Sequence, residues 1–188
     1  MIPTERDILA VHKDAAPSRE AFELVYEHCQ IVCSVASQFL AGLDVDGDLV
    51  RAGALLHDVG VYRVGTTAYV RHGVLGHELL AGLGFSERIC RFASHHTGVG
   101  ITKDDVLEQG LPIPVADYLP GSREEELVMY ADKFHSKRTP PVFVSGDSYE
   151  AIVSRWGVEK AEIFADLRRR YGDPLLDELS ASTGHAVV

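Results

Sequence analysis

Apolar residues recur with helical spacing along most of this chain, and this periodicity constrains its fold more than any other feature. Between residues 18 and 43 they fall mostly three or four positions apart, which places them on one face of a helix. Ser18 suits the N-cap of this helix, and Gly42 suits its end. Because no alternating strand of useful length and no internal repeat interrupts the pattern, we predict an all-α fold.

Further helices are expected along the rest of the chain, over the segments 48–60, 72–84, 86–96, 102–109, 123–137, 147–156 and 158–171. The sequence therefore predicts a compact bundle of about seven or eight helices. A Pro-rich linker at 139–146 precedes the last two helices, which form a hairpin too small to count as a second domain. Residues 1–188 are accordingly expected to form one domain, with a frayed, polar end from residue 172 onward.

The charge balance excludes extensive binding of nucleic acid. Lys and Arg number 18 against 28 Asp and Glu, so the net charge is −10 at pH 7, and a field of that sign repels a polyanion. No apolar run reaches the roughly 20 residues of a membrane span, and the N-terminal residues lack an apolar signal core. We expect a cytoplasmic protein without membrane contact. Its three cysteines, Cys29, Cys33 and Cys90, suit neither a disulfide framework nor a zinc ribbon.

Four ionisable side chains lie on or beside the apolar stripes of their helices: His28, His57, Asp58 and Asp132. A buried carboxylate is costly unless a cation or hydrogen-bond donors lie nearby. Imidazole nitrogen and carboxylate oxygen favour Mn, Fe, Zn or Ni over calcium as their metal. Because adjacent helical residues point about 100° apart, His57 and Asp58 could fill only one side of a metal ion, and neighbouring helices would supply the other ligands.

The order of these four residues, with the local sequences LLHDVG and YADKF, resembles the HD superfamily of metal-dependent phosphohydrolases. His72 opens the sequence HGVLG and His96 opens HTG, 24 residues later. Both segments are similar to the extra histidines of HD subfamilies that hold two metals, which include bacterial diadenosine tetraphosphate hydrolases and cyclic-di-GMP phosphodiesterases. HTGVGI, the Pro-rich stretch after it and EEELVMYADKF also resemble small uncharacterised HD proteins. The resemblance covers about residues 20–145, which would form the metal-binding core of an HD-domain helical bundle.

The resemblance implies a cofactor of one or two divalent ions, drawn from Fe, Mn, Zn, Ni, Co and Mg. One ion would be held by four side chains: His28, His57, Asp58 and Asp132. The second would be held by His72 and His96, with Asp58 bridging the two. His77 and His95 are their neighbours in the sequence and remain alternative ligands.

The expected catalytic residues are Asp58, Arg63 and Lys133, and Lys137 and Arg138 are further candidates for binding phosphate. The sequence departs from the family pattern at two points. Many two-metal members carry a lysine two or three residues beyond the His-Asp pair, whereas here the segment HDVGVYR offers only Arg63. The Gly-Tyr-Pro signature of the cyclic-di-GMP enzymes is absent, which argues against that substrate.

The function implied is hydrolysis of a phosphoester or phosphoanhydride, with a nucleotide as the favoured small-molecule substrate, and a homodimer is compatible with the sequence. Two alternatives stay open. Some HD proteins with a similar His/Asp set use a mixed-valent di-iron centre as oxygenases, and a regulatory module could bind a nucleotide without turning it over. The remaining histidines, His12, His135 and His185, are expected to be solvated, and Trp156 is expected in the core of the C-terminal hairpin.

Overall fold

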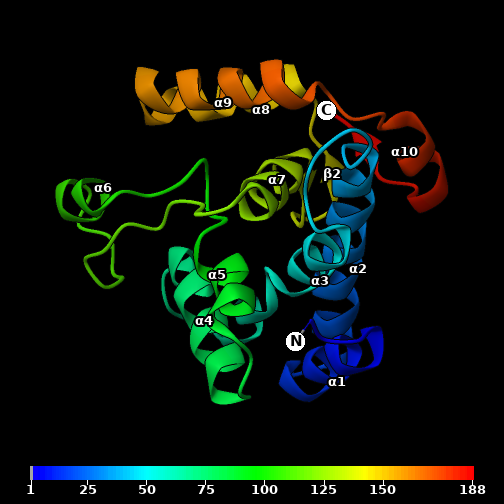
Figure 1. Ribbon diagram of the computed structural model, residues 1–188, viewed down its shortest axis with the longest axis vertical. Helices are drawn as coiled ribbons and strands as arrows, with labels where there is room; N and C mark the ends of the chain where they lie inside the picture. Colours follow the sequence, from blue (N-terminus) through cyan, green and yellow to red (C-terminus); the bar gives the residue numbers. More distant parts are fainter. Residues whose placement is uncertain (1) are drawn as a thin grey trace.

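The computed structural model describes residues 2–188, and helices dominate it (Figure 1). Ten α-helices lie within these described residues: α1 (Glu5–Ala15), α2 (Arg19–Gln38), α3 (Gly47–Leu56), α4 (His72–Gly82), α5 (Glu87–Ser94), α6 (Lys103–Glu108), α7 (Arg123–Ala131), α8 (Gly146–Val153), α9 (Val158–Tyr171) and α10 (Asp177–Thr183). The all-α prediction is confirmed, with more helices than the sequence indicated. Across residues 2–188 no helix combines the length and the apolar composition needed to cross a membrane.

Helices α2, α3 and α7 pack against one another and form the centre of the core (Figure 1). The predicted helix from residue 18 is α2, and the Ser18 hydroxyl accepts a hydrogen bond from the Ala21 amide at 3.1 Å. Val25, Val32 and Val35 lie on its buried face. Burial of such side chains drives the packing, at about 25 cal/mol for each Å² of apolar surface removed from water.

Helix α3 begins at Gly47 and ends at Leu56, before the predicted end at residue 60. Asp46 caps it and accepts a hydrogen bond from the Leu49 amide. After Leu56 the chain passes through His57 and Asp58 into a 3-10 turn, η1 (Val59–Arg63), and a second 3-10 turn, η2 (Tyr69–Arg71), leads into α4. Gly60 permits this packing, because a Cβ there would clash with the backbone of α4. The tight turn thus brings the His-Asp pair beside the start of α4.

Helix α7 ends at Ala131, earlier than the prediction of a helix through residue 137. A 3-10 turn, η3 (Asp132–Phe134), follows, and the chain then becomes extended in β1 (His135–Ser136). This strand pairs antiparallel with β2 (Val142–Phe143), which pairs parallel with β3 (Ala186–Val187). The expectation of a frayed end from residue 172 was therefore wrong, because α10 and β3 fold back onto the body of the protein.

The predicted C-terminal hairpin is present as α8 and α9, joined by the 3-10 turn η4 (Ser154–Trp156). The two helices lie together along one side of the molecule (Figure 1). The expectation that Trp156 belongs to the hairpin core was wrong, because its side chain is 66% exposed. Its place in the turn, and not on a helix face, keeps the indole out of the packing.

His12 lies in α1, a helix that the sequence reading missed, and the expectation that it is solvated was wrong. Its side chain is fully buried, with Nε2 2.7 Å from the carbonyl oxygen of Leu55 and Nδ1 2.8 Å from the hydroxyl of Tyr62. The carbonyl can only accept, so Nε2 carries the proton and Nδ1 accepts from the tyrosine. Burial lowers the pKa of His12 from 6.5 to about 4.

This pKa predicts that His12 makes stability depend on pH. The unfolded chain binds the proton more tightly, so the contribution of neutral His12 is complete above pH 6.5 and is lost as the pH falls toward 4. Relative to His12→Asn, the free energy of unfolding of the wild type should fall by about 2 kcal/mol between pH 7 and pH 5. Urea unfolding at the two pH values measures this difference, and a pH-independent difference would contradict the burial of a neutral imidazole.

Candidate metal centre

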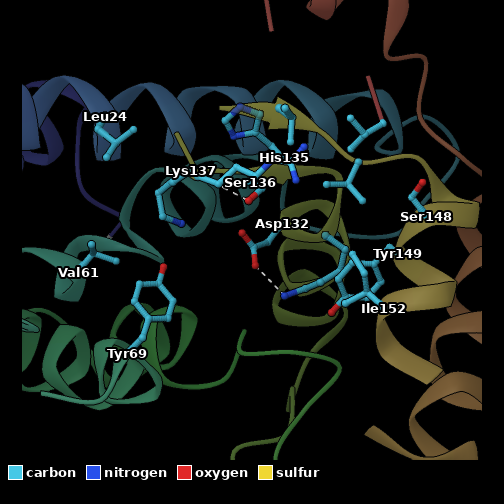
Figure 2. Close-up of a pocket in the computed structure, with 15 residues that line it drawn as sticks. Leu24, Val61, Tyr69, Asp132, His135, Ser136, Lys137, Ser148, Tyr149 and Ile152 are labelled. Carbon is cyan, nitrogen blue, oxygen red and sulfur yellow. Dashed lines mark hydrogen bonds and ion pairs between the residues drawn. The ribbon is translucent and has the colours of Figure 1, made fainter. Parts of the chain in front are cut away.

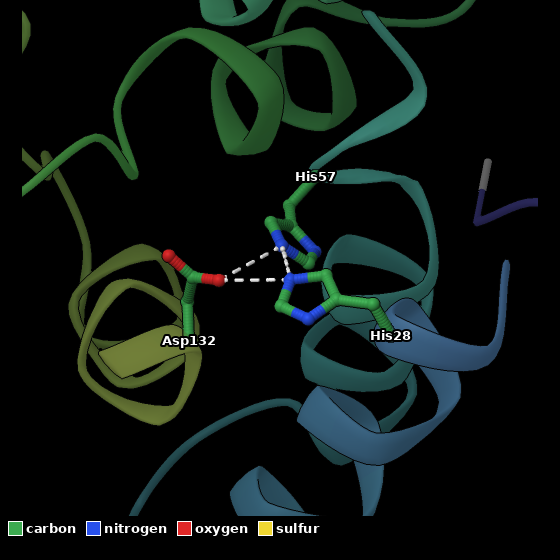
Figure 3. Close-up of side chains that lie close together, drawn as sticks. All are labelled: His28, His57 and Asp132. Atoms are coloured by element: carbon green, nitrogen blue, oxygen red, sulfur yellow. Dashed lines mark hydrogen bonds and ion pairs between the residues drawn. The ribbon is translucent and has the colours of Figure 1, made fainter. Parts of the chain in front are cut away.

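Three side chains from separate elements converge on one point (Figure 3). His28 projects from α2, His57 follows the last residue of α3, and Asp132 opens η3. Asp132 Oδ1 lies 3.0 Å from His28 Nε2 and 3.3 Å from His57 Nε2, and the two Nε2 atoms are 3.3 Å apart. These atoms form a compact triangle of potential metal ligands.

Asp58 lies beside this triangle and faces two groups of imidazoles at once. Its Oδ2 is 3.3 Å from His28 Nε2 and 3.8 Å from His57 Nε2. Its Oδ1 is 3.6 Å from His72 Nε2 and 3.7 Å from His96 Nε2. The carboxylate therefore stands between two sets of nitrogens, with one oxygen directed to each.

His72 and His96 form the second set. His72 is the first residue of α4, and His96 lies just beyond α5, which packs against α4. Their Nε2 atoms are 3.0 Å apart, and both side chains are buried. The structure therefore brings these two histidines, 24 residues apart in the sequence, next to each other.

The backbone fixes which ring nitrogen faces the centre. The Nδ1 atoms of His57, His72 and His96 lie 2.7, 2.7 and 3.0 Å from the carbonyl oxygens of Ala54, Tyr69 and Phe92. A carbonyl only accepts, so each Nδ1 carries a proton, and a neutral ring then directs its Nε2 lone pair at the centre. Burial lowers the pKa of His72, and it lowers the pKa of His96 to about 4, which favours neutral rings at these two positions. At His57 burial is outweighed by the neighbouring Cys29 and Asp58, which raise the pKa.

These lone pairs provide a test of whether a cation fits. Two neutral imidazoles whose Nε2 atoms are 3.0 Å apart repel each other unless a positive charge lies between or beside them. Asp58 is 1% exposed, and its Oδ1 has no hydrogen-bond partner among residues 2–188. Burial opposes its charge, but Lys137, in ion-pair contact, and His57 outweigh burial and hold the pKa of Asp58 well below its usual range. The donor set therefore fits one or two divalent ions.

His135 and His185 belong to the surroundings of this centre, although both were expected to be solvated. Nδ1 of His28 lies 2.8 Å from Nδ1 of His135, and Nε2 of His135 lies 3.0 Å from Nδ1 of His185. If His28 directs its Nε2 lone pair at a cation, its Nδ1–H must donate to His135, which in turn donates to His185. Both contacts depend on the small sheet, because His135 begins β1 and His185 directly precedes β3. Only the abundance of histidine in the sequence pointed to them.

This chain of rings predicts that His135 supports the metal affinity of His28. Hydrogen-bond partners of ligating histidines fix their orientation, and their loss costs about 10- to 100-fold in metal affinity. His135→Ala should therefore weaken binding of a divalent ion by that factor, measured by competition with a fluorescent chelator. His77→Ala is the matched control, since His77 lies outside the cluster. Equal metal affinity in wild type and His135→Ala would contradict the proposed support.

Three of the predicted site residues are not brought to this cluster. His77 contacts Ser94 at 3.0 Å and Glu87 at 3.2 Å, and His95 contacts Ser94 at 2.6 Å and Arg91 at 2.9 Å. Arg63 ends η1 with an exposed side chain, and it does not line either of the two cavities next to the cluster. Its position at the end of η1 places the side chain in solvent, so the structure gives no support for a role of Arg63 at the site.

The other three basic candidates lie close to the cluster. A cavity of about 590 Å³ opens beside the cluster, and its wall includes Asp132, Lys133, Lys137 and Arg138 (Figure 2). Lys133 is 7% exposed and donates to Asp132 Oδ2 at 2.7 Å and to the carbonyl oxygen of His96 at 3.1 Å. Lys137 contacts Asp58 Oδ2. The sequence placed Lys137 on a helix, whereas it directly follows the strand β1 and lines the cavity.

Known proteins resemble this chain in sequence. The family model described as HD domain matches residues 25–137, a span that includes all six clustered histidines and aspartates. An uncharacterised protein of Methanocaldococcus jannaschii is 44% identical over 123 residues, which are 62% of this chain and 70% of that protein. A tRNA (cytidine(56)-2'-O)-methyltransferase of Picrophilus torridus is 37% identical over 135 residues, 72% of this chain and 37% of the relative. The chain thus spans little more than a third of that methyltransferase.

A solved structure shares the fold. The HD domain of the L. monocytogenes phosphodiesterase PgpH, in complex with cyclic-di-AMP, superimposes with a TM-score of 0.51. The alignment covers 89% of this chain and 98% of that one, at 16% sequence identity. At this identity the likeness shows a common helical architecture.

Proposed function

The chain belongs to the HD domain family, and from this premise we propose that it is a metal-dependent phosphohydrolase that cleaves a phosphoester or phosphoanhydride of a nucleotide. The observation that carries the proposal is the position of Asp58. Its Oδ2 faces His28 and His57, whereas its Oδ1 faces His72 and His96. One carboxylate between two sets of imidazoles suits a pair of divalent ions that share it.

The chemistry of phosphoryl transfer matches this site. Divalent ions at such a centre lower the pKa of water to about 7 and offset the charge of phosphoryl oxygens. The protein holds its ligands rigidly, because the backbone carbonyls behind His57, His72 and His96 fix the rings. Lys133, Lys137 and Arg138 line the adjoining cavity and would bind the phosphate groups of the substrate.

A nucleotide is the proposed class of substrate for two reasons. The cavity offers three basic side chains next to the centre in a protein whose net charge is −10, so this is a local site for an anion. The related HD domain of PgpH was solved with cyclic-di-AMP, which supports a nucleotide without identifying the one used here. The methyltransferase activity named for the longer relative belongs to a chain of which the match covers 37%.

The test is an assay of the purified protein whose metal content has been measured. The protein is loaded separately with Mn²⁺, Fe²⁺, Zn²⁺, Ni²⁺, Co²⁺ and Mg²⁺ and offered a panel of mononucleotides, dinucleotides and nucleoside polyphosphates. We expect release of phosphate or of a nucleotide fragment that stops when a chelator removes the ion. No product from any substrate, with metal shown to be bound, would overturn the proposal.

The same samples separate the two alternative functions. An oxygenase with a mixed-valent di-iron centre would consume oxygen and give an electron paramagnetic resonance signal without releasing phosphate. A regulatory module would show a rise in melting temperature with a nucleotide and no product. Either result would replace the hydrolase, while the assignment of the metal ligands would stand.

A further inference from the structure

A second cavity opens on the other flank of the centre and differs in chemistry from the first. Its volume is about 380 Å³, within the range of small-molecule sites. Aromatic and aliphatic side chains dominate its wall, among them Tyr69, Tyr149, Trp156, Val70, Ile101 and Leu111. His72, one of the clustered histidines, also lines it. The cavity is therefore apolar and aromatic and reaches the centre directly.

The two cavities differ in the charged side chains of their walls. The wall of the first cavity holds three basic side chains, Lys133, Lys137 and Arg138, against one carboxylate, Asp132. The wall of the second holds one basic side chain, Lys160, which is paired with Asp105 at 2.6 Å. An anionic group would consequently settle in the first cavity, and a flat apolar group would settle in the second.

The two cavities meet at the centre. Asp132 lines the first and His72 lines the second, while Tyr69 and Tyr149 line both. Tyr69 stacks on His72 with ring centroids 4.6 Å apart. Figure 2 shows Tyr69 and Tyr149 on opposite sides of the first cavity in that view. A ligand whose phosphate lies at the centre can thus extend one end into each cavity.

We propose that the second cavity binds the base of the nucleotide substrate, with Trp156 and Tyr69 as stacking surfaces. This proposal rests on the proposed function and adds where the base lies. Trp156 is 66% exposed and Tyr69 is 53% exposed, so both side chains are accessible at the cavity. Every base has a flat π face, and stacking on an aromatic side chain is tolerant of base identity. Trp156 lies beyond residues 25–137, so the family pattern does not contain it.

The first test uses the intrinsic fluorescence of Trp156, which is the one tryptophan of the sequence. Adenosine 5'-monophosphate and guanosine 5'-monophosphate are titrated into the metal-loaded protein, and ribose 5-phosphate is the matched probe without a base. We expect saturable quenching by the two nucleotides and none by ribose 5-phosphate. Absence of quenching by nucleotides that bind in calorimetry, or equal quenching by ribose 5-phosphate, would overturn the subsite.

The second test is kinetic. With a nucleotide that the enzyme hydrolyses, Trp156→Ala should raise KM about 5- to 100-fold, the range expected from loss of one base stack. Trp156→Phe should restore most of the affinity. Val158→Ala, an exposed residue of the same hairpin that does not line the cavity, is the control. An unchanged KM in Trp156→Ala would refute the base subsite and leave the hydrolase intact.

The two proposals fail in different ways. Quenching by nucleotides in a protein that hydrolyses none of them would support the base subsite and count against the hydrolase. Hydrolysis with no quenching and no change in KM would support the hydrolase and overturn the subsite. Melting curves of each variant show whether it is folded before either result is read.

Discussion

Asp58→Ala is expected to remove the bound metal and to lower turnover by about a thousandfold or more. Its two oxygens face the two sets of imidazoles, so the substitution would take one ligand from each position. Metal stabilisation of a phosphoryl transition state amounts to several kcal/mol, and each 1.36 kcal/mol is a factor of ten in rate. Elemental analysis after gel filtration measures the metal, and product release measures turnover.

The control for this variant is Asp48→Ala. Asp48 lies in α3, on the same stretch of chain, but its side chain is 73% exposed and pairs with Arg51. We expect this variant to keep full metal content and full turnover. If Asp58→Ala kept its full metal content, the assignment of Asp58 as the shared ligand would be wrong.

Lys137→Met is expected to keep the metal and to lower kcat/KM by about 10- to 100-fold. Lys137 contacts Asp58 Oδ2, the oxygen that also faces His28 and His57. In the loaded enzyme we expect its ammonium to turn from this carboxylate to a phosphate oxygen in the cavity that it lines. A charge-assisted hydrogen bond of this kind contributes about 1.5–3 kcal/mol, which gives the expected factor. The methionine keeps an unbranched side chain, one atom shorter than lysine, and removes the ammonium group with its charge and its donors.

Arg63→Ala tests whether Arg63 contributes to phosphate binding. The sequence favoured Arg63 as a phosphate ligand, whereas its side chain is exposed and does not line either cavity at the centre. Its loss should change kcat/KM less than twofold, a small effect typical of a surface change away from the site. A large loss in Arg63→Ala together with an unaffected Lys137→Met would reverse the assignment of the basic groups.

The sequence predicted which side chains come together better than it predicted their surroundings. His28, His57, Asp58 and Asp132 each follow or interrupt an apolar stripe, so their burial could be inferred from helical spacing. His72 and His96 came from resemblance to a family and not from spacing. The structure brings all six side chains together. His77 and His95 lie outside this cluster, because each forms a hydrogen bond with Ser94.

The surroundings depend on contacts that local patterns do not encode. His135 reaches His28 because α7 stops at Ala131 and the chain becomes extended. His185 reaches His135 because the last strand pairs in parallel with β2, about 45 residues earlier in the chain. Two-residue strands are too short to show an alternating pattern, so the sequence predicted helix for the first region and a frayed end for the second.

Anomalous scattering from a crystal grown without chelator, and soaked in Mn²⁺, tests the central claim most directly. We predict two peaks: one contacted by His28, His57 and Asp132, and a second contacted by His72 and His96, with Asp58 between them. Density in which Asp58 and Asp132 are contacted only by protein donors, with no peak among the six side chains, would contradict the account.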